Sequence, residues 1–408
     1  MSTIKKINQV AISSLFLNIY LPSLLIFLGM GASLPVVPLF AKSLGAGLAI
    51  TGTVVALAGL GPVVFSIPAG LLISRFGVRQ ITIAIITAML VTAIGTALSR
   101  SVAQLAIMRF ISGALQSALV ICRVSYMRQI LAPEQRGRAI AAIGGTMRIG
   151  RFVGPIAGGF LAQKLGFPAV FWAQALLTLP AVLLSTSKLQ GIDREAEKGD
   201  TPKGLSEFAG LISNYKKTFL TAGITVFSLG LLRSSQQLVI PLWGDHLGLD
   251  VAQIGLIIGL ASALDMILFY PAGIIMDKMG RKWAVLPCLI FMSISFGLLP
   301  LSTSFAGLLV VALLNGFGNG IGSGIVMTMG SDYAPKNATM SFLGVWFMIS
   351  GAGSLIGPEG VGAIAEAVAL GLAPLVIAAI GLGGALFTLI FVKEPLKSKA
   401  RGTIQGQT

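Results

Sequence analysis

The sequence Pro68-Ala69-Gly70-Leu71-Leu72-Ile73-Ser74-Arg75-Phe76-Gly77-Val78-Arg79 recurs later in the chain as Pro271-Ala272-Gly273-Ile274-Ile275-Met276-Asp277-Lys278-Met279-Gly280-Arg281-Lys282. The two stretches are 203 residues apart, and the same offset relates Gly113 to Gly316 and Gly154-Pro155 to Gly357-Pro358. A single register that holds across the first half of the chain indicates an internal duplication. The repeated unit is about half as long as the chain.

The composition places this duplicated chain in a membrane. Of its 408 residues, 55% are hydrophobic and only 11% are charged, with a mean hydropathy of +0.90, whereas soluble domains have about 25% charged residues. Many apolar stretches approach the ~20 residues that a helix needs to cross a bilayer. Duplicated apolar units of this kind are typical of secondary transporters. The twelve predicted spans are 15–40, 48–73, 80–98, 105–131, 139–165, 169–185, 219–242, 251–276, 283–301, 305–331, 341–366 and 371–392.

The spans and the repeat together predict an all-α membrane protein made of two six-helix bundles. The first bundle is expected over 1–185 and the second, with a tail, over 219–408. A charged linker, 186–218, joins them. Its second part, 205–215, has apolar residues at helical spacing, which predicts a short helix on the inner membrane surface.

Basic residues predict the orientation in the membrane. Twenty-one Lys and Arg fall on one side of the predicted spans, and three (Lys42, Arg100 and Lys164) fall on the other. The positive-inside rule therefore places both termini and the linker in the cytoplasm, for a multi-pass protein of the inner or plasma membrane. The same bias, with contact to anionic lipids, accounts for the net charge of +15 without a nucleic-acid partner.

Three motifs resemble those of the major facilitator superfamily. The segment 70–79 resembles the loop between helices 2 and 3, usually written G-x-L-a-D-R-x-G-R-[RK], and 277–282 looks like its weaker copy between helices 8 and 9. Leu105-x-x-x-Arg109-x-x-x-Gly113 is similar to the helix 4 motif. The resemblance implies the twelve-helix fold with a pseudo-twofold axis, and gating roles for the loop and helix residues. The loop and helix 4 residues concerned are Gly70, Arg75, Gly77, Arg79, Arg109, Gly113, Asp277, Gly280 and Arg281.

A glycine motif in the fifth span resembles that of the drug:proton antiporter branch of this superfamily. It reads Gly150-x-x-x-Gly154-Pro155-x-x-Gly158-Gly159, and Gly353-x-x-x-Gly357-Pro358 echoes it in the eleventh span. Glycine and proline let helices approach closely and bend, which suits a moving interface. Any one Gly-x-x-x-Gly spacing can reflect ordinary packing, but the helix 5 run as a whole is expected to be a functional hinge.

The motifs depart from the family pattern at three points. Ser74 stands where the family has its loop aspartate, although the second copy keeps Asp277. Ala141 replaces a glycine that usually precedes the helix 5 motif, and the first span lacks the acidic residue of several proton-driven exporters. The charge network that the family uses for gating therefore lacks its loop acid in the first half of this chain.

Seven charged residues lie inside the predicted spans, at least four residues from either end. They are Arg109, Arg123, Arg148, Arg151, Arg233, Asp265 and Glu359. Each costs about 2.5–3.5 kcal/mol at the bilayer centre, so such residues usually have a function. The third, sixth, ninth and twelfth spans carry none; in the superfamily these helices are peripheral and face lipid.

The arginines exceed the acids by three, which leaves positive charge to be balanced. Arg148 and Arg151 share a helix face, and Arg233 precedes the polar residues Gln236 and Gln237. Backbone carbonyls, an anionic substrate or cavity water could satisfy these side chains. A structural role is favoured for Arg109 because it belongs to a motif. The expected substrate-binding residues are Arg123, Arg148, Arg151, Arg233, Gln236 and Gln237.

Asp265 is the first candidate for proton coupling, and Glu359 the second. A buried carboxyl can take up and release a proton as a cavity opens to either side. An ion pair between Asp265 and a nearby arginine, with a purely structural role, fits the sequence equally well.

These features predict a secondary transporter rather than an enzyme. No Gly-x-x-x-x-Gly-Lys-[Ser/Thr] loop occurs, and one histidine and two separated cysteines provide no metal cluster, so we expect no cofactor. The expected activity is export of a small organic compound in exchange for protons, by a monomer. An organic-anion carrier, importing or exporting, is the first alternative. A lipid translocase or a membrane sensor on the same fold is another, although no soluble output domain is visible.

Overall fold

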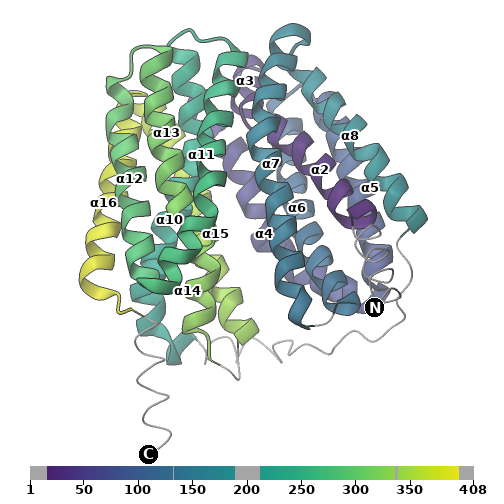
Figure 1. Ribbon diagram of the computed structural model, residues 1–408. Helices are drawn as coiled ribbons and strands as arrows, with labels where there is room; N and C mark the ends of the chain where they lie inside the picture. Colours follow the sequence, from purple (N-terminus) through teal and green to yellow (C-terminus); the bar gives the residue numbers. More distant parts are fainter. Residues whose placement is uncertain (1–15, 132, 189–211, 336–338, 395–408) are drawn as a thin grey trace, which may run out of the picture. The chain divides into compact units, whose positions relative to one another are not determined.

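The computed structural model describes residues 16–131, 133–188, 212–335 and 339–394, and in them the chain is helical almost throughout (Figure 1). The first repeat forms the π-helix η1 (Phe16–Tyr20), α2 (Leu21–Ala32), α3 (Val36–Ser43), α4 (Leu48–Phe76), α5 (Val78–Ala97), α6 (Val102–Ile130), α7 (Pro133–Leu165) and α8 (Phe167–Lys188). The second forms α10 (Lys216–His246), α11 (Val251–Lys278), α12 (Arg281–Leu298), the 3₁₀ helix η2 (Leu299–Leu301), α13 (Phe305–Ile321), α14 (Ile325–Tyr333), α15 (Thr339–Ala367) and α16 (Leu372–Phe391).

Each of the twelve predicted spans coincides with one helix or with helices in series. The first span is broken at 33–35, where α2 and α3 meet at 46° before Pro35 and Pro38. The tenth is broken at Gly322–Gly324, where Gly324 has a φ of +83° that other residues rarely adopt.

Length and apolarity alone identify fewer crossings. Among the described residues, eight helical segments are long and apolar enough to cross a membrane, or nine if the bent pair is one span. The all-helical membrane fold is thus confirmed, while the count of twelve stays a prediction. The expected surface helix at 205–215 falls mainly on residues 189–211, outside the described part.

Two compact units make up the structure. Unit 1 comprises the described residues within Met1–Gly45, Leu60–Glu197 and Asp250–Gly259. Unit 2 comprises those within Ala46–Gly59, Lys198–Leu249 and Leu260–Thr408. Each unit therefore corresponds to one repeat, except that the first turns of α4 lie in unit 2 and those of α11 lie in unit 1.

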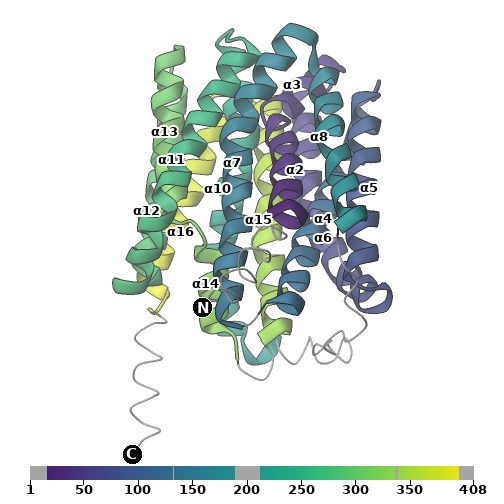
Figure 2. The same ribbon diagram turned by 45° about the vertical axis from the view of Figure 1, so that its right-hand side comes forward.

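Unit 1 is held together by α2 packed between α7 and α8, with α5 against α6 and α8 (Figures 1 and 2). Glycines make the α2–α7 packing close. A Cβ added at Gly154 would lie 2.6 Å from the carbonyl carbon of Gly31, and one at Gly158 would lie 2.7 Å from the Cα of Ala32. Gly150 meets the backbone of Phe27 in the same way.

Unit 2 repeats this arrangement with α10 against α15 and α12 against α13 and α16. Gly353 of α15 approaches the backbone of Phe227, and Gly357 approaches that of Leu231. The glycines of α7 and α15 therefore play the same part in their units, because each set lets its helix lie directly against the backbone of a neighbouring helix.

The first turns of α4 and α11, which lie in the unit of the other repeat, pack there through a second set of glycines. In unit 1, a Cβ at Gly159 of α7 would lie 3.1 Å from the Cα of Gly255 in α11. In unit 2, a Cβ at Gly362 of α15 would lie 3.1 Å from the Cα of Gly52 in α4. Both pairs differ by the offset of 203, so the two contacts are equivalent.

The helices of the sixth and twelfth predicted spans carry exposed apolar side chains in stripes. On α8, Trp172, Leu176, Leu179 and Leu183 are 45–70% exposed and recur every three or four residues. On α16, Leu382, Leu386 and Leu389 do the same. Such stripes on a soluble protein would be unfavourable; on this chain they form surfaces suited to lipid.

We predict that Gly154→Ala lowers the thermal unfolding temperature of the purified protein. The added methyl group has no space beside Gly31, and overpacking costs about 1–3 kcal/mol. Gly145→Ala is the matched control on the same helix, because nothing lies within 4 Å of a Cβ added there. The control should unfold at the same or a higher temperature, since alanine favours helix by about 1 kcal/mol. Equal effects of both changes would contradict the role of Gly154.

Candidate functional site

Three polar side chains meet inside unit 2. Arg233 of α10 donates from Nε to Oδ1 of Asn319 in α13, at 2.7 Å. The Nδ2 of Asn319 donates to Oδ1 of Asp265 in α11, at 3.1 Å. A second guanidinium nitrogen of Arg233 donates to the carbonyl oxygen of Gly322, at 2.8 Å. Asp265 is only 8% exposed. A carboxyl and a guanidinium are thus linked through one amide.

Small residues bring these three helices close enough to form the link. A Cβ at Gly320 would lie 3.1 Å from the Cα of Asp265, and Gly316 meets the backbone of Ala261 one turn earlier. The missing side chains of Gly316 and Gly320 let α13 lie directly against α11. Asn319, next to Gly320, then reaches both α10 and α11.

Asn319 was absent from the sequence-based site, which contained Arg233 and Asp265. The signal available was Asn315-Gly316-Phe317-Gly318-Asn319-Gly320, two amides among glycines in an apolar helix. Asn315, one turn from Asn319, is 1% exposed, and neither of its amide atoms has a hydrogen-bond partner among the described residues. A fully buried amide without a partner is costly.

Unit 1 contains a buried guanidinium. Arg123 of α6 is 2% exposed, and one of its nitrogens donates to the carbonyl oxygen of Asn18, at 3.4 Å. That carbonyl belongs to η1, a rare π-helix of a kind often found at functional sites. The Nε and Nη2 atoms of Arg123 have no hydrogen-bond partner in the part of the chain that is described.

Arg148 and Arg151 continue the face of α7 that carries Pro155 and Gly159. Arg148 is half-buried and donates to the carbonyl oxygen of Gly144 on its own helix, at 3.1 Å. Arg151 is exposed. Backbone carbonyls therefore receive hydrogen bonds from Arg123, Arg148 and Arg233. They are the first of the three kinds of partner that the sequence analysis considered for these arginines.

The remaining intramembrane residues are less tightly held. Arg109 is half-buried, and its Nε has no hydrogen-bond partner among the described residues. Gln236 and Gln237 are half-buried beside Arg233 on α10. Glu359 is exposed, one residue beyond the Gly357-Pro358 pair. Of the two coupling candidates, Asp265 is the buried one.

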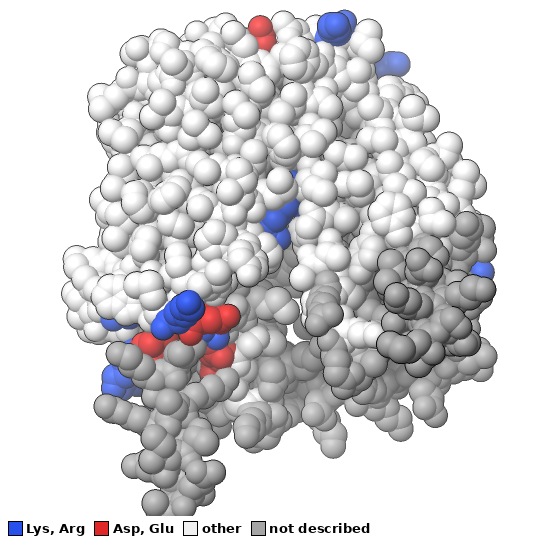
Figure 3. Space-filling view, viewed as in Figure 1, with Lys and Arg blue, Asp and Glu red and all other residues white. Residues whose placement is uncertain are grey.

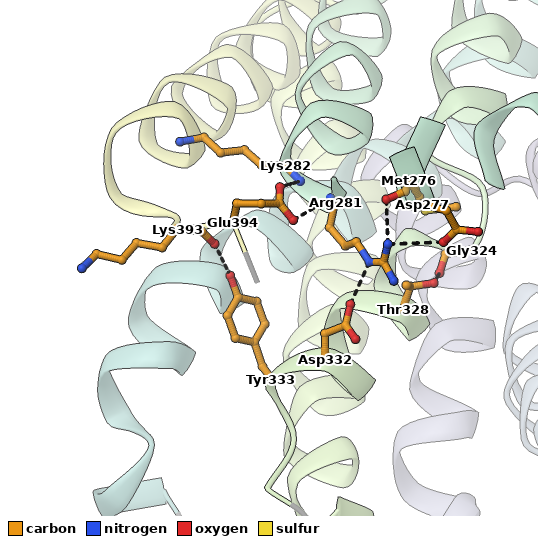
Figure 4. A network of polar contacts seen from close by, with 10 residues as sticks. All are labelled: Met276, Asp277, Arg281, Lys282, Gly324, Thr328, Asp332, Tyr333, Lys393 and Glu394. Carbon is orange, nitrogen blue, oxygen red and sulfur yellow. Dashed lines mark hydrogen bonds and ion pairs between the residues drawn. The ribbon is translucent and has the colours of Figure 1, made fainter. Parts of the chain in front are cut away.

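Arg281 is the centre of a polar network at the predicted cytoplasmic end of unit 2 (Figure 4). Its Nε pairs with Asp332 at 2.7 Å, and a terminal nitrogen pairs with Asp277 at 3.3 Å and with the carbonyl oxygen of Met276 at 2.6 Å. The side chains of Arg281 and Asp332 are 11% and 14% exposed, against 77% for Asp277. The pair with Asp332 is therefore the better shielded one.

Glu394 caps the first turn of α12 in the same network. Its two carboxylate oxygens accept from the backbone N–H groups of Arg281 and Lys282, each at 2.9 Å. The preceding Gly280 has a φ of +109°, which lets the chain turn sharply into the helix. Figure 3 shows charged side chains gathered at this end, with a largely white surface above. Neither Asp332 nor Glu394 was expected from the sequence.

The first repeat lacks the charged partners of this network. At the positions equivalent to Arg281 and Asp332, 203 residues earlier, stand Val78 and Gln129. One interaction persists: Arg79 donates to the carbonyl oxygen of Thr186 at 3.2 Å, as the equivalent Lys282 donates to that of Leu389 at 2.7 Å. The basic residue that ends each motif thus binds a carbonyl oxygen of the repeat's last helix in both halves.

The other loop residues of the first motif are exposed. Arg75 lies over the ring of Phe76, 5.3 Å from its centroid. Gly77 has a φ of +83° and precedes α5 as Gly280 precedes α12. Nothing lies within 4 Å of a Cβ added at Gly70. In α6, which carries the helix 4 motif of the family, Gly113 is buried against Gly61 of α4.

A family model described as Major Facilitator Superfamily matches residues 19–230 and 222–408, which is nearly the whole chain. The chain belongs to this superfamily. Its members are transporters and not enzymes, so the protein is a multi-pass membrane transporter. The internal repeat, the glycine contacts and the second-half loop network are therefore features of a superfamily carrier.

The relatives differ in what their names state. An uncharacterised MFS-type transporter of Methanocaldococcus jannaschii is 23% identical over 352 residues, which cover 85% of this chain and 90% of that protein. Multidrug resistance protein 2 of Bacillus subtilis is 25% identical over 299 residues, 71% of this chain and 73% of that protein. The solved structure of a point mutant of the nucleoside transporter NupG is 14% identical and superposes with a TM-score of 0.79, covering 93% of this chain and all of that one. It shows a shared fold.

We predict that Arg281→Gln lowers the unfolding free energy of this superfamily carrier by about 2 kcal/mol, because the change removes the ion pair with the shielded Asp332. Lys278→Gln, an exposed change in the same loop, should alter it by less than about 0.5 kcal/mol. Thermal unfolding of the two variants measures the difference. A loss in Lys278→Gln as large as in Arg281→Gln would contradict the assignment.

Proposed function

We propose that this superfamily member exports a small organic compound in exchange for protons, by alternating access. The observation that carries the proposal is the buried Asp265, held by Asn319 and linked through it to Arg233. A carboxyl inside an apolar bundle is costly and is seldom kept without a function. Its proton can be exchanged when the site becomes accessible from one side and then from the other.

Export is favoured by the glycine face of α7 and by the relative named as a multidrug resistance protein. The glycines of α7 form the motif that resembles the antiporter branch. They let the backbone of α7 lie directly against α2 and against the start of α11. Contacts without side chains can separate and re-form with little change in side-chain packing. Such contacts suit a carrier that alternates between two states.

An organic-anion carrier is the second candidate, and Arg123 is the observation that favours it. Two nitrogens of this buried guanidinium have no hydrogen-bond partner among the described residues. A carboxylate of a substrate would fill such positions with short, charge-assisted hydrogen bonds. Arg148, Arg151, Arg233, Gln236 and Gln237 are further residues for binding the same substrate.

We predict that Asp265→Asn abolishes proton-coupled transport and leaves substrate binding measurable. Asparagine keeps the size of the side chain and cannot exchange a proton. The assay uses proteoliposomes with a trapped pH-sensitive dye, challenged with ethidium as a lipophilic cation and with glucuronate as an organic anion. Whichever probe the unaltered protein moves together with protons serves as the substrate.

Asp250→Asn is the matched control for this experiment. Asp250 is an exposed loop residue whose carboxylate accepts from the backbone N–H of Gln253 at 2.8 Å, and asparagine caps a helix equally well. The control should transport normally. Normal coupled transport by Asp265→Asn would refute its coupling role and direct attention to Glu359.

We predict that Arg123→Gln weakens binding of glucuronate about 10- to 100-fold if the carrier moves anions. The loss of a hydrogen bond from a charged donor costs about 1.5–3 kcal/mol. Arg100→Gln, at an exposed position, is the control and should bind as before. Unchanged glucuronate affinity in a folded Arg123→Gln protein would assign Arg123 a structural role, and transport of ethidium by that variant would favour the general exporter.

A further inference from the structure

The amide of Asn319 has two different ends, and among the described residues each end binds one charged side chain. Its oxygen accepts from Arg233, and its nitrogen donates to Asp265. A guanidinium can only donate hydrogen bonds, and an ionised carboxylate can only accept them. The orientation of the amide is therefore set by the two charged groups, and the reverse orientation would place donor against donor at Arg233.

A proton on Asp265 changes what this amide can do. The protonated carboxyl loses its charge, so the hydrogen bond from the Asn319 nitrogen is no longer charge-assisted. The carboxyl also becomes a donor, and the one acceptor atom of the Asn319 amide is the oxygen that already accepts from Arg233. Protonated Asp265 and Arg233 then compete for one oxygen atom.

Few charged side chains lie in the helices around this site. Among the described titratable side chains, Arg233 of α10 and Cys288 of α12 lie beside Gly322. Helix α13 has no charged residue. The other charged residues of α10, α11 and α12 lie in the first or last turn of their helices.

We propose that Asn319 is a positioning residue that couples the proton on Asp265 to the position of Arg233. Ionised Asp265 orients the amide so that it holds Arg233 beside Gly322. Proton uptake weakens the bond to Asp265 and loosens Arg233 from the amide oxygen. Arg233 then leaves the position in which it binds a substrate group, so the proton and the substrate lower each other's affinity by the same factor, as exchange requires. This inference rests on the proposed proton coupling at Asp265.

The test is an infrared titration of the reconstituted protein, which detects the C=O stretching band of a protonated carboxyl. Asp265→Asn identifies the band that belongs to Asp265. In Asn319→Leu the midpoint should move about one pH unit higher, because the hydrogen bond that favours the ionised carboxylate is gone. Asn319→Gln keeps both ends of the amide and should restore most of the original midpoint.

Asn315→Leu is the matched control. This residue lies one turn from Asn319 on the same helix, is fully buried, and has no hydrogen-bond partner among the described residues. Its replacement should leave the midpoint unchanged. If Asn319→Leu does not fold, Asn319→Ala removes the same amide with less bulk and replaces it in the titration.

A double-mutant cycle tests the link to Arg233. Arg233→Gln should raise the midpoint in the unaltered protein, and should raise it less in the Asn319→Leu background, because the route through the amide is already lost. Equal shifts in both backgrounds would mean that Arg233 acts directly through space and would overturn the inference.

The two proposals fail in different ways. If Asp265→Asn removes no band across the titration, Asp265 does not exchange protons, and both the proposed coupling and the role of Asn319 are wrong. If the band is present but its midpoint is the same in Asn319→Leu, the coupling stands and the role of Asn319 is wrong.

Discussion

Close approach of backbones, made possible by the absence of Cβ atoms, is the constraint on which this structure depends. Helices in lipid gain little from burying apolar side chains against each other, since lipid is equally apolar, so packing must come from intimate contact. The contacts of α7 with α2, of α15 with α10, and of α13 with α11 all occur at glycines. These contacts place Asn319 within reach of two other helices, and they place Arg148 and Arg151 on the face of α7 that meets α11.

The two repeats share this backbone frame and differ in the charges placed on it. Gly159 with Gly255 and Gly362 with Gly52 are equivalent pairs with equal spacing, and Arg79 and Lys282 make equivalent bonds to carbonyl oxygens. The ion pairs of Arg281 belong to the second repeat, whose equivalents in the first are neutral. The buried carboxyl–amide–guanidinium link also belongs to the second repeat, while the buried Arg123 belongs to the first. Duplication supplied symmetry, and substitution gave each half different chemistry.

Patterns within one helix were readable from the sequence, and contacts between distant helices were not. Apolar length located the helices, and the 203-residue offset located the repeat, because both are properties of the local chain. The positions of Asp265 and Arg233 were evident because a charge in an apolar run is conspicuous. Asn319 was missed because an uncharged amide stands out little, and its importance arises only when α13 lies against α11. Glu394 was missed for a similar reason, since it caps a helix 112 and 113 residues earlier in the chain.

The exchange of the first turns of α4 and α11 has a mechanical consequence. Each of these helices is one continuous rod that begins in one unit and ends in the other, and the boundaries fall at Gly59–Leu60 and Gly259–Leu260. A rigid rod anchored at both ends resists any displacement of its anchors. A change in the distance between the two ends of either helix must therefore bend it or pull one end from its seat. Glycine at each boundary, with Pro62 just beyond the first, lets the two helices bend at these points.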